Sequence, residues 1–176
     1  MIDARVLQTA RGEVVLRPEQ SSDADFLYAL FRSHMLEELA LMPIDAATKE
    51  HLVRMQFNSQ TATYRAQFPQ ARFDIVEQGG SPIGRLIVDT GADAGCIVDF
   101  ALLPERRGAG LGTAILAAVL LDQRRPVLSK VLYNNEASLR MCRRVGFVHI
   151  GGELPFLQLE WRPPIVAGDP TGGAGG

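Results

Sequence analysis

Hydrophobic and polar positions divide the chain into a helical first third and a strand-rich remainder. An apolar run at residues 14–16 predicts a first strand, which a proline ends. Apolar positions at helical spacing then predict two helices, one after Ser22 and one over about residues 48–64. We expect Ser22 to cap the first helix, with Asp25 stabilising its N-terminus.

The middle of the chain has the pattern of strands joined by tight turns. Residues 73–77 and 83–88 are predicted strands, and the turn at residues 78–81 makes them a hairpin. A second turn separates this hairpin from residues 96–102, which are almost continuously apolar. Such a run predicts a central strand that is covered on both faces.

A glycine-rich turn follows this strand, and helices and strands then alternate. The pattern predicts a helix that ends near Asp122, and a second helix that begins at Asn134 or Asn135 and ends near Arg144, before Gly146. The predicted strands of this part are residues 127–133, 147–150 and 156–161. The resulting order is β, α, α, β, β, β, α, β, α, β, β. It differs from a doubly wound sheet and from a sandwich, so it predicts a mixed α/β (α+β) sheet with helices on both faces.

Composition narrows the class of protein. The chain has 176 residues, 47% of them hydrophobic and 22% charged, which fits one folded domain. The net charge of −2 gives no overall attraction to nucleic acid, and no apolar run is long enough to cross a bilayer. Cys96 and Cys142 match no zinc-binding spacing, so we predict no metal and interpret both as reduced thiols of a cytoplasmic protein.

The predicted domain covers residues 13–161. Residues 1–12 are an N-terminal extension without a predicted element, and the chain start has no apolar core typical of a signal peptide. Residues 162–176 are rich in proline and glycine and nearly lack apolar side chains, so we expect a disordered tail.

The glycine-rich turn is the strongest chemical signal in the sequence. Gly108, Gly110 and Gly112 alternate with other residues just before a helix begins, which lets backbone amides close around an anion. A nucleotide P-loop needs a lysine after the last glycine, and Thr113 stands there instead. The spacing also differs from the G-x-G-x-x-G of dinucleotide-binding proteins. Taken alone, the glycine pattern is also compatible with a turn that binds no ligand.

Two motifs resemble those of the GNAT superfamily of N-acetyltransferases. Arg107 to Gly112 match its (Arg/Gln)-x-x-Gly-x-(Gly/Ala) signature. Asn135 to Phe147 resemble its second motif, which begins 28 residues after Arg107. The resemblance covers roughly residues 13–161 and implies a mostly antiparallel sheet of about seven strands, with a splay between the two central strands.

The resemblance also implies acetyl-CoA as co-substrate. Its pyrophosphate would lie on the amides of the turn, and its pantetheine arm between residues 96–102 and 127–133, where a bulge near Asp99 would produce the splay. The implied binding residues are Phe100, Ala101, Leu102, Arg107, Gly108, Ala109, Gly110, Leu111, Gly112, Thr113 and Asn135. Further arginines either contact the phosphates or form a solvated face; these are Arg106, Arg140, Arg143 and Arg144. Asn135 is equally suited to cap a helix.

The catalytic residues are less clear from the sequence. Cys142 stands where the family usually has a tyrosine that protonates the leaving thiolate; it is either a proton donor or a small buried side chain. Tyr133 is a candidate substitute. Asp99 is either the base or an ion-pair partner of an arginine. His34, with Glu37 and Glu38, lies in a segment that forms part of the acceptor wall in the family.

The leading prediction is an enzyme that moves an acetyl group from acetyl-CoA to a primary amine of a small molecule or peptide, by direct attack in a ternary complex. The alternative is a catalytically weak or inactive CoA-binding protein that acts as a sensor or partner. An acyl donor larger than acetyl is a third candidate. The resemblance also makes a homodimer a candidate assembly.

Overall fold

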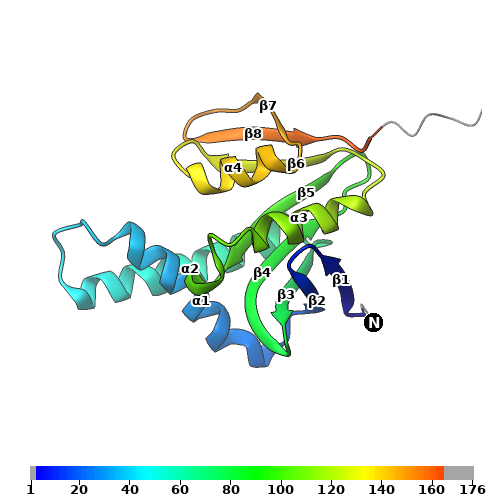
Figure 1. Ribbon diagram of the computed structural model, residues 1–176. Coiled ribbons are helices and arrows are strands. Elements are labelled where there is room, and N and C mark those ends of the chain that lie inside the picture. Colours follow the sequence, from blue (N-terminus) through cyan, green and yellow to red (C-terminus); the bar gives the residue numbers. More distant parts are fainter. Residues whose placement is uncertain (1–2, 165–176) are drawn as a thin grey trace, which may run out of the picture.

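A computed structural model describes residues 3–164 and contains one eight-stranded sheet (Figure 1). The strands are β1 (Arg5–Thr9), β2 (Gly12–Pro18), β3 (Arg72–Gln78), β4 (Ser81–Asp89), β5 (Gly95–Leu102), β6 (Val127–Leu132), β7 (Val148–Gly151) and β8 (Phe156–Trp161). The helices are α1 (Ala24–Glu38), α2 (Ala46–Gln67), α3 (Leu111–Leu121) and α4 (Glu136–Arg144), with short 3₁₀ turns η1 (Ser21–Asp23) and η2 (Pro104–Arg106). The predicted mixed, mostly antiparallel sheet is confirmed, because among the strands of residues 3–164 β5 and β6 form the one parallel pair.

Helices cover both faces of the sheet. On β4, Leu86 belongs to the buried cluster formed with α3 and α4, whereas its neighbour Arg85 bonds to Gln60 of α2. Successive residues of a strand point to opposite faces, so α3 and α4 cover one face and α2 covers the other. Helix α1 packs against α2.

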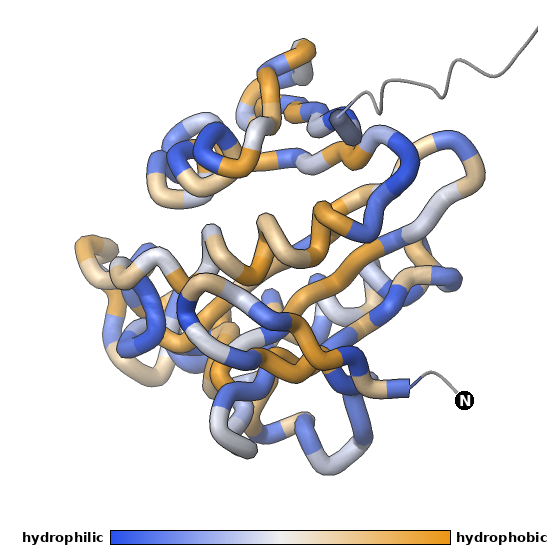
Figure 2. Tube along the Cα trace, turned by 45° about the vertical axis from the view of Figure 1, so that its right-hand side comes forward, coloured by the Kyte–Doolittle hydropathy of each residue, from blue (hydrophilic) through white to orange (hydrophobic). Residues whose placement is uncertain are grey.

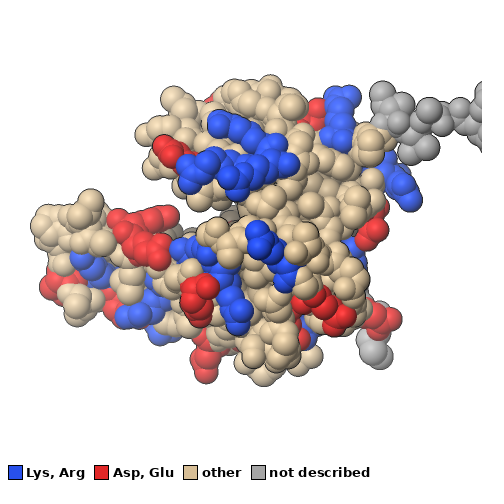
Figure 3. Space-filling model, viewed as in Figure 1, with Lys and Arg blue, Asp and Glu red and all other residues tan. Residues whose placement is uncertain are grey.

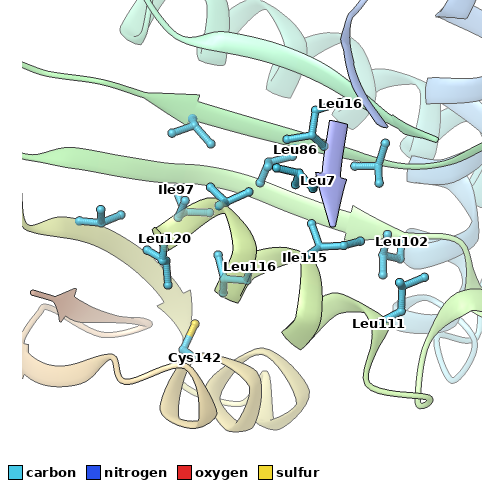
Figure 4. Close-up of a cluster of buried hydrophobic side chains, with 14 of the residues drawn as sticks. Leu7, Leu16, Leu86, Ile97, Leu102, Leu111, Ile115, Leu116, Leu120 and Cys142 are labelled. Carbon is cyan, nitrogen blue, oxygen red and sulfur yellow. The ribbon is translucent and has the colours of Figure 1, made fainter. Parts of the chain in front are cut away.

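The main hydrophobic core lies between the sheet and α3. Ile115, Leu116 and Val119 of α3 are almost completely buried against side chains of the sheet (Figure 4). The most hydrophobic stretches accordingly run through the middle of the molecule (Figure 2). Burial of these apolar side chains fixes α3 on the sheet, and with it the position of the glycine-rich turn that precedes α3.

The N-terminus departs from the sequence expectation. Residues 5–9 of the predicted extension form β1, which gives the sheet eight strands where about seven were expected. The signal was weak because Leu7 is the only buried side chain of this strand. A tight turn lets β1 pair with β2, and Gly12 there has a φ of 96°, which favours glycine.

The start of α1 also differs from the prediction. A 3₁₀ turn precedes the helix, and Asp23, not Ser22, occupies its N-cap position. The Asp23 carboxylate accepts a hydrogen bond from the Gln20 amide at 2.8 Å and pairs with Arg17 at 2.7 Å. The hydrogen bond from Arg17 holds the pKa of Asp23 below its ordinary value. The ion pair with Arg17, which the apolar spacing does not reveal, therefore accompanies a helix start one residue later than predicted.

The central strands separate as expected. Within the described residues, β5 and β6 pair only over Gly95–Ile97 and Val127–Ser129. On the other edge of β5, Ile87 faces Asp99 and Val88 faces Ile97, so Val98 bulges out of the ladder. The predicted splay and the bulge near Asp99 are both present. Most of the predicted disordered tail, residues 165–176, lies outside the described residues.

Candidate active site

The three glycines of the turn have two different tasks. Gly108 and Gly110 both have φ values of 80°, a region that side chains with a Cβ rarely adopt. Gly112 has an ordinary backbone, but a Cβ there would lie 3.2 Å from Sδ of Met141 and 3.5 Å from Leu102. The first two therefore shape the loop, and the third lets α4 approach α3 closely.

The turn delivers the N-terminus of α3 to the splay. The amide of Ala114 donates to the Gly110 carbonyl at 3.0 Å, which is the first hydrogen bond of the helix. The amides of Leu111, Gly112 and Thr113 precede this bond and face out of the helix end. Together with the helix dipole they form a site suited to an anion.

Two adjoining cavities follow the splay. The larger, about 940 Å³, runs from the glycine turn past the N-terminus of α4 to the end of α1. The smaller, about 330 Å³, lies between β5, β6, α4 and α2. Both are lined by Phe100, Leu132, Asn135, Ser138 and Met141. Cations gather over α4 above this hollow, and acidic side chains lie across from them (Figure 3).

Arg107 joins the turn to α1. Its Nε donates to the Leu102 carbonyl at 2.9 Å, and its Nη1 pairs with Glu37 at 3.0 Å. Its Nη2 is buried and has no hydrogen-bond partner among the described residues, and the same holds for Nε2 of His34. Burial, reinforced by Arg107, lowers the pKa of His34. Two buried polar atoms without a hydrogen-bond partner therefore belong to side chains that line the larger cavity.

The second motif begins with a helix cap. The Asn135 side chain accepts a hydrogen bond from the Ser138 amide at 3.0 Å and so starts α4. Asn135 also lines both cavities. The two tasks that the sequence suggested for Asn135 are compatible, because the cap uses only its Oδ1 atom.

A polar network covers the α2 side of the smaller cavity. Arg85, which is buried, donates to Asp99 through Nε at 2.8 Å and to Gln60 at 3.1 Å. Both bonds from Arg85 to Asp99 end on Oδ2, which leaves Oδ1 free of this pair. One helical turn after Gln60, Tyr64 lines the same cavity. Burial, with a contribution from Asp99, raises the pKa of Tyr64 to about 12.

The structure brings together most of the predicted binding residues. The larger cavity is lined by Phe100, Ala101, Leu102, Arg107, Gly108, Gly110, Gly112, Thr113 and Asn135. Ala109 is exposed at the turn and Leu111 packs into the core, so the side chains of these two line neither cavity. Among the additional arginines, Arg140 and Arg144 line the larger cavity.

The three candidate catalytic residues lie in different surroundings. Asp99 and Cys142 line the smaller cavity, whereas Tyr133 lines neither cavity and is 56% exposed. Cys142 is only 4% exposed, and its sulfur is directed toward α3 (Figure 4). Burial raises the pKa of this thiol to about 11.

Sequence reasoning missed the contribution of α2. Gln60 and Tyr64 belong to no motif, and their helix was recognised only from its apolar spacing. One available signal was Arg85, a charged residue within a predicted hydrophobic strand, which needs a partner when buried. It pointed to a polar network on that face of the sheet, although not to the partners.

Three features are absent from the described residues: a metal cluster, a disulfide and a membrane-spanning helix. No cluster of three or more His, Cys, Asp or Glu side chains is arranged to hold a metal ion. Both cysteines are unpaired. Within residues 3–164, none of the helices combines the length and the apolar character that a membrane span requires.

Comparisons with solved structures place the fold. A PaiA N-acetyltransferase from Thermoplasma acidophilum, in complex with coenzyme A, is 16% identical, with a TM-score of 0.65 over 85% of this chain and 99% of that chain. An acetyltransferase from Thermus thermophilus is 22% identical, with a TM-score of 0.60 over 84% of this chain and 94% of that chain. RimJ from Mycobacterium smegmatis, in complex with CoA-disulfide, is 20% identical, with a TM-score of 0.62 over 90% of this chain and 86% of that chain.

The sequence comparisons decide the family. A search of curated proteins found no match. The model of the acetyltransferase (GNAT) family matches residues 36–147, more than half of the chain, and this segment includes the glycine turn, both strands of the splay and the helix of the second motif. The chain therefore belongs to the GNAT family of acetyltransferases.

Proposed function

We propose that this chain transfers the acetyl group of acetyl-CoA to a primary amine of a small molecule or peptide, by direct attack in a ternary complex. One observation carries the proposal. The N-terminus of α3 opens onto the splay, where β5 and β6 no longer form hydrogen bonds with each other. An anion and an extended amide-containing arm can therefore be bound by one continuous surface.

Donor binding follows from the chemistry of that surface. The amides of Leu111, Gly112 and Thr113 suit a pyrophosphate, and the Arg107 side chain, which lines the larger cavity, adds a positive charge. Beyond Ile97, the edge of β5 that faces β6 is free to pair with the amides of a pantetheine arm. Asn135 lines both cavities and reaches the point where this arm passes between them.

Catalysis requires alignment and a proton acceptor. Holding both reactants in a reactive geometry can remove about 7–11 kcal/mol of the barrier. An alkyl amine with a pKa near ~10 is free base in only about one part in a thousand at neutral pH, so a base assists the attack. Asp99 is the proposed acceptor of this proton, directly or through water, because its Oδ1 is free of the pair with Arg85 and it lines the cavity.

Neither of the two proton donors suggested by the sequence, Cys142 and Tyr133, suits the leaving thiolate. The pKa of Cys142, about 11, lies well above the 9.0 of an ordinary cysteine, so proton transfer from Cys142 to the thiolate is unfavourable. Tyr133 lines neither cavity. Release of the thiolate with protonation by water is the route that these positions favour.

The splay beside the N-terminus of α3 also supports a second candidate function. In this candidate the protein binds CoA and acts as a sensor or as a partner of another protein, without catalysing acetyl transfer. Purified protein would be incubated with acetyl-CoA and, separately, with spermidine, glucosamine, phenethylamine and an alanine-terminated tetrapeptide, while free CoA thiol is measured. We expect at least one amine to raise CoA release above hydrolysis and to gain one acetyl group by mass. No release, together with a higher melting temperature in acetyl-CoA, would establish the second candidate.

Three finer features remain proposals. Acetyl, and not a larger group, is the expected acyl donor, and equilibrium affinities across acyl-CoA chain lengths test this. A homodimer and a cytoplasmic location are expected from the family resemblance and the unpaired cysteines; light scattering measures the first, and fractionation of cells the second.

A further inference from the structure

Only one of the three tyrosines of the chain lines either cavity. The hydroxyl of Tyr28 donates to the carboxylate of Glu50, a residue of α2 that lines neither cavity. Tyr133 lies at the exposed end of β6. Tyr64 reaches the smaller cavity from α2, on the opposite face of the sheet from the helix that carries Cys142.

Tyr64 is held in place by the network that docks α2. Arg85 bonds to Gln60, which precedes Tyr64 by one helical turn, and the Arg85 guanidinium lies 6.0 Å from the centre of the Tyr64 ring. The same guanidinium holds Asp99 on β5, directly after the bulge. The phenol therefore has a defined position relative to the strand on which the splay begins.

The hydroxyl of Tyr64 is available to a ligand. Among the described residues it has no hydrogen-bond partner, in contrast to the hydroxyl of Tyr28. Burial and Asp99 raise the pKa of Tyr64 and keep the phenol protonated well above neutral pH. A protonated phenol inside a cavity is a hydrogen-bond donor for a developing negative charge, and it needs no proton transfer to act.

We propose that Tyr64 donates a hydrogen bond to the thioester carbonyl oxygen of the acyl donor while the amine attacks. This rests on the proposed acetyl transfer. As the N–C bond forms, the carbonyl electron pair moves to the oxygen, where Tyr64 stabilises it. When the carbonyl re-forms, the C–S bond breaks and its electron pair leaves on sulfur. The amine proton goes to Asp99 or water, the thiolate is protonated by water, and the Tyr64 proton stays on the phenol.

This role differs from that of the tyrosine expected at the position of Cys142. That tyrosine would give its proton to the leaving sulfur from the α4 face. Tyr64 acts from the α2 face, beside Asp99, and keeps its proton. One face of the sheet then carries the donor-binding helix ends. The other carries Tyr64, which meets the thioester carbonyl, and Asp99, which meets the attacking amine.

The first test needs no acceptor. Dissociation constants would be measured for S-acetonyl-CoA, which keeps a carbonyl but cannot transfer it, and for S-ethyl-CoA, which lacks a carbonyl. We expect Tyr64→Phe to weaken binding of the acetonyl compound by about 2-fold to 10-fold, the worth of one hydrogen bond, and to leave the ethyl compound unchanged. Equal effects on both compounds, or none on either, would overturn the proposal.

The second test uses the amine that gives the fastest CoA release. We expect Tyr64→Phe to lower kcat by about 10²-fold, as for loss of one oxyanion donor, and to raise KM for acetyl-CoA by no more than about 10-fold, the worth of the ground-state hydrogen bond. The shape of the pH–rate profile should persist, since a phenol that stays protonated contributes no titration to it. Tyr28→Phe is the matched control and should keep wild-type turnover. If Tyr133→Phe, and not Tyr64→Phe, lowers kcat, the exposed tyrosine is the active one and the proposal is wrong.

The two tests separate failure of this role from failure of the proposed function. Absence of turnover with every amine contradicts the acetyltransferase activity, while the analogue affinities still report whether Tyr64 contacts the acyl carbonyl. Circular dichroism and melting curves of Tyr64→Phe must match those of the wild type for the kinetic comparison. A second variant, Tyr64→Leu, removes the ring as well and should reproduce the kinetic loss if the hydroxyl is responsible.

Discussion

The proposed donor side and the proposed acceptor side of the splay are built by different means. The proposed donor side offers backbone amides from one contiguous stretch, the end of β5 to the first turn of α3, together with side chains such as those of Arg107 and Asn135. The acceptor side consists of side chains from three elements, and Arg85 connects them. A site made of backbone amides depends on the backbone conformation of a few residues. A site made of side chains depends on long-range contacts, and single substitutions can alter those.

The largest effect is expected from the Arg85–Asp99 pair. Asp99→Ala leaves a buried guanidinium without its counter-charge, which should lower the free energy of unfolding by about 3 kcal/mol. Urea denaturation measures this loss. Replacing both residues with apolar ones, as in Arg85→Met with Asp99→Leu, should restore much of the stability but not the turnover. A double variant as unstable as Asp99→Ala would show that the charge imbalance is not the cause.

The second-largest effect is expected from Gly110, where loss of CoA affinity can be distinguished from loss of stability through backbone strain alone. Gly110→Ala places a Cβ at a φ of 80° and should cost about 1–2 kcal/mol of stability. Because the strained turn presents the amides of α3, affinity for CoA should also fall by about tenfold. Gly79→Ala is the matched control, with a φ of 60° in the β3–β4 hairpin and free space around its Cβ. It should show the stability loss alone; a similar loss of CoA affinity would contradict the assignment of the turn.

The smallest effect is expected from Cys142, a buried residue of α4. Cys142→Ala should lower the free energy of unfolding by about 1 kcal/mol through lost packing and leave turnover nearly unchanged near neutral pH. The folded pKa of about 11 exceeds the ordinary 9.0, so the thiol contributes stability below pH 9 that is lost as the pH rises toward 11. The free energies of unfolding measured below pH 9 and above it should therefore differ less in Cys142→Ala than in the wild type. Loss of turnover in this variant would make the thiol catalytic.

The order of elements from residue 13 onward followed from local signals, whereas the splay and the proposed donor site were expected from the resemblance of two motifs to those of a known family. Glycine spacing and helix starts are encoded by neighbouring residues, so Gly108 to Thr113 could be placed from the sequence. Strand β1 was not predicted, because Leu7 is its only buried side chain and the strand therefore has little apolar pattern. The position of Tyr64 at the cavity was not predicted. It depends on how α2 packs on the sheet through the hydrogen bond between Arg85 and Gln60, which are 25 positions apart.

The short pairing of β5 and β6 has a consequence for how the molecule moves. Three residues on each strand form the whole described parallel ladder, so the sheet has few hydrogen bonds between its β1–β5 and β6–β8 portions. Amide protons of β6 and β8 should therefore exchange with solvent as a group separate from those of β3 and β4. A ligand that bridges the gap replaces the missing hydrogen bonds, so its binding should slow exchange in both portions together.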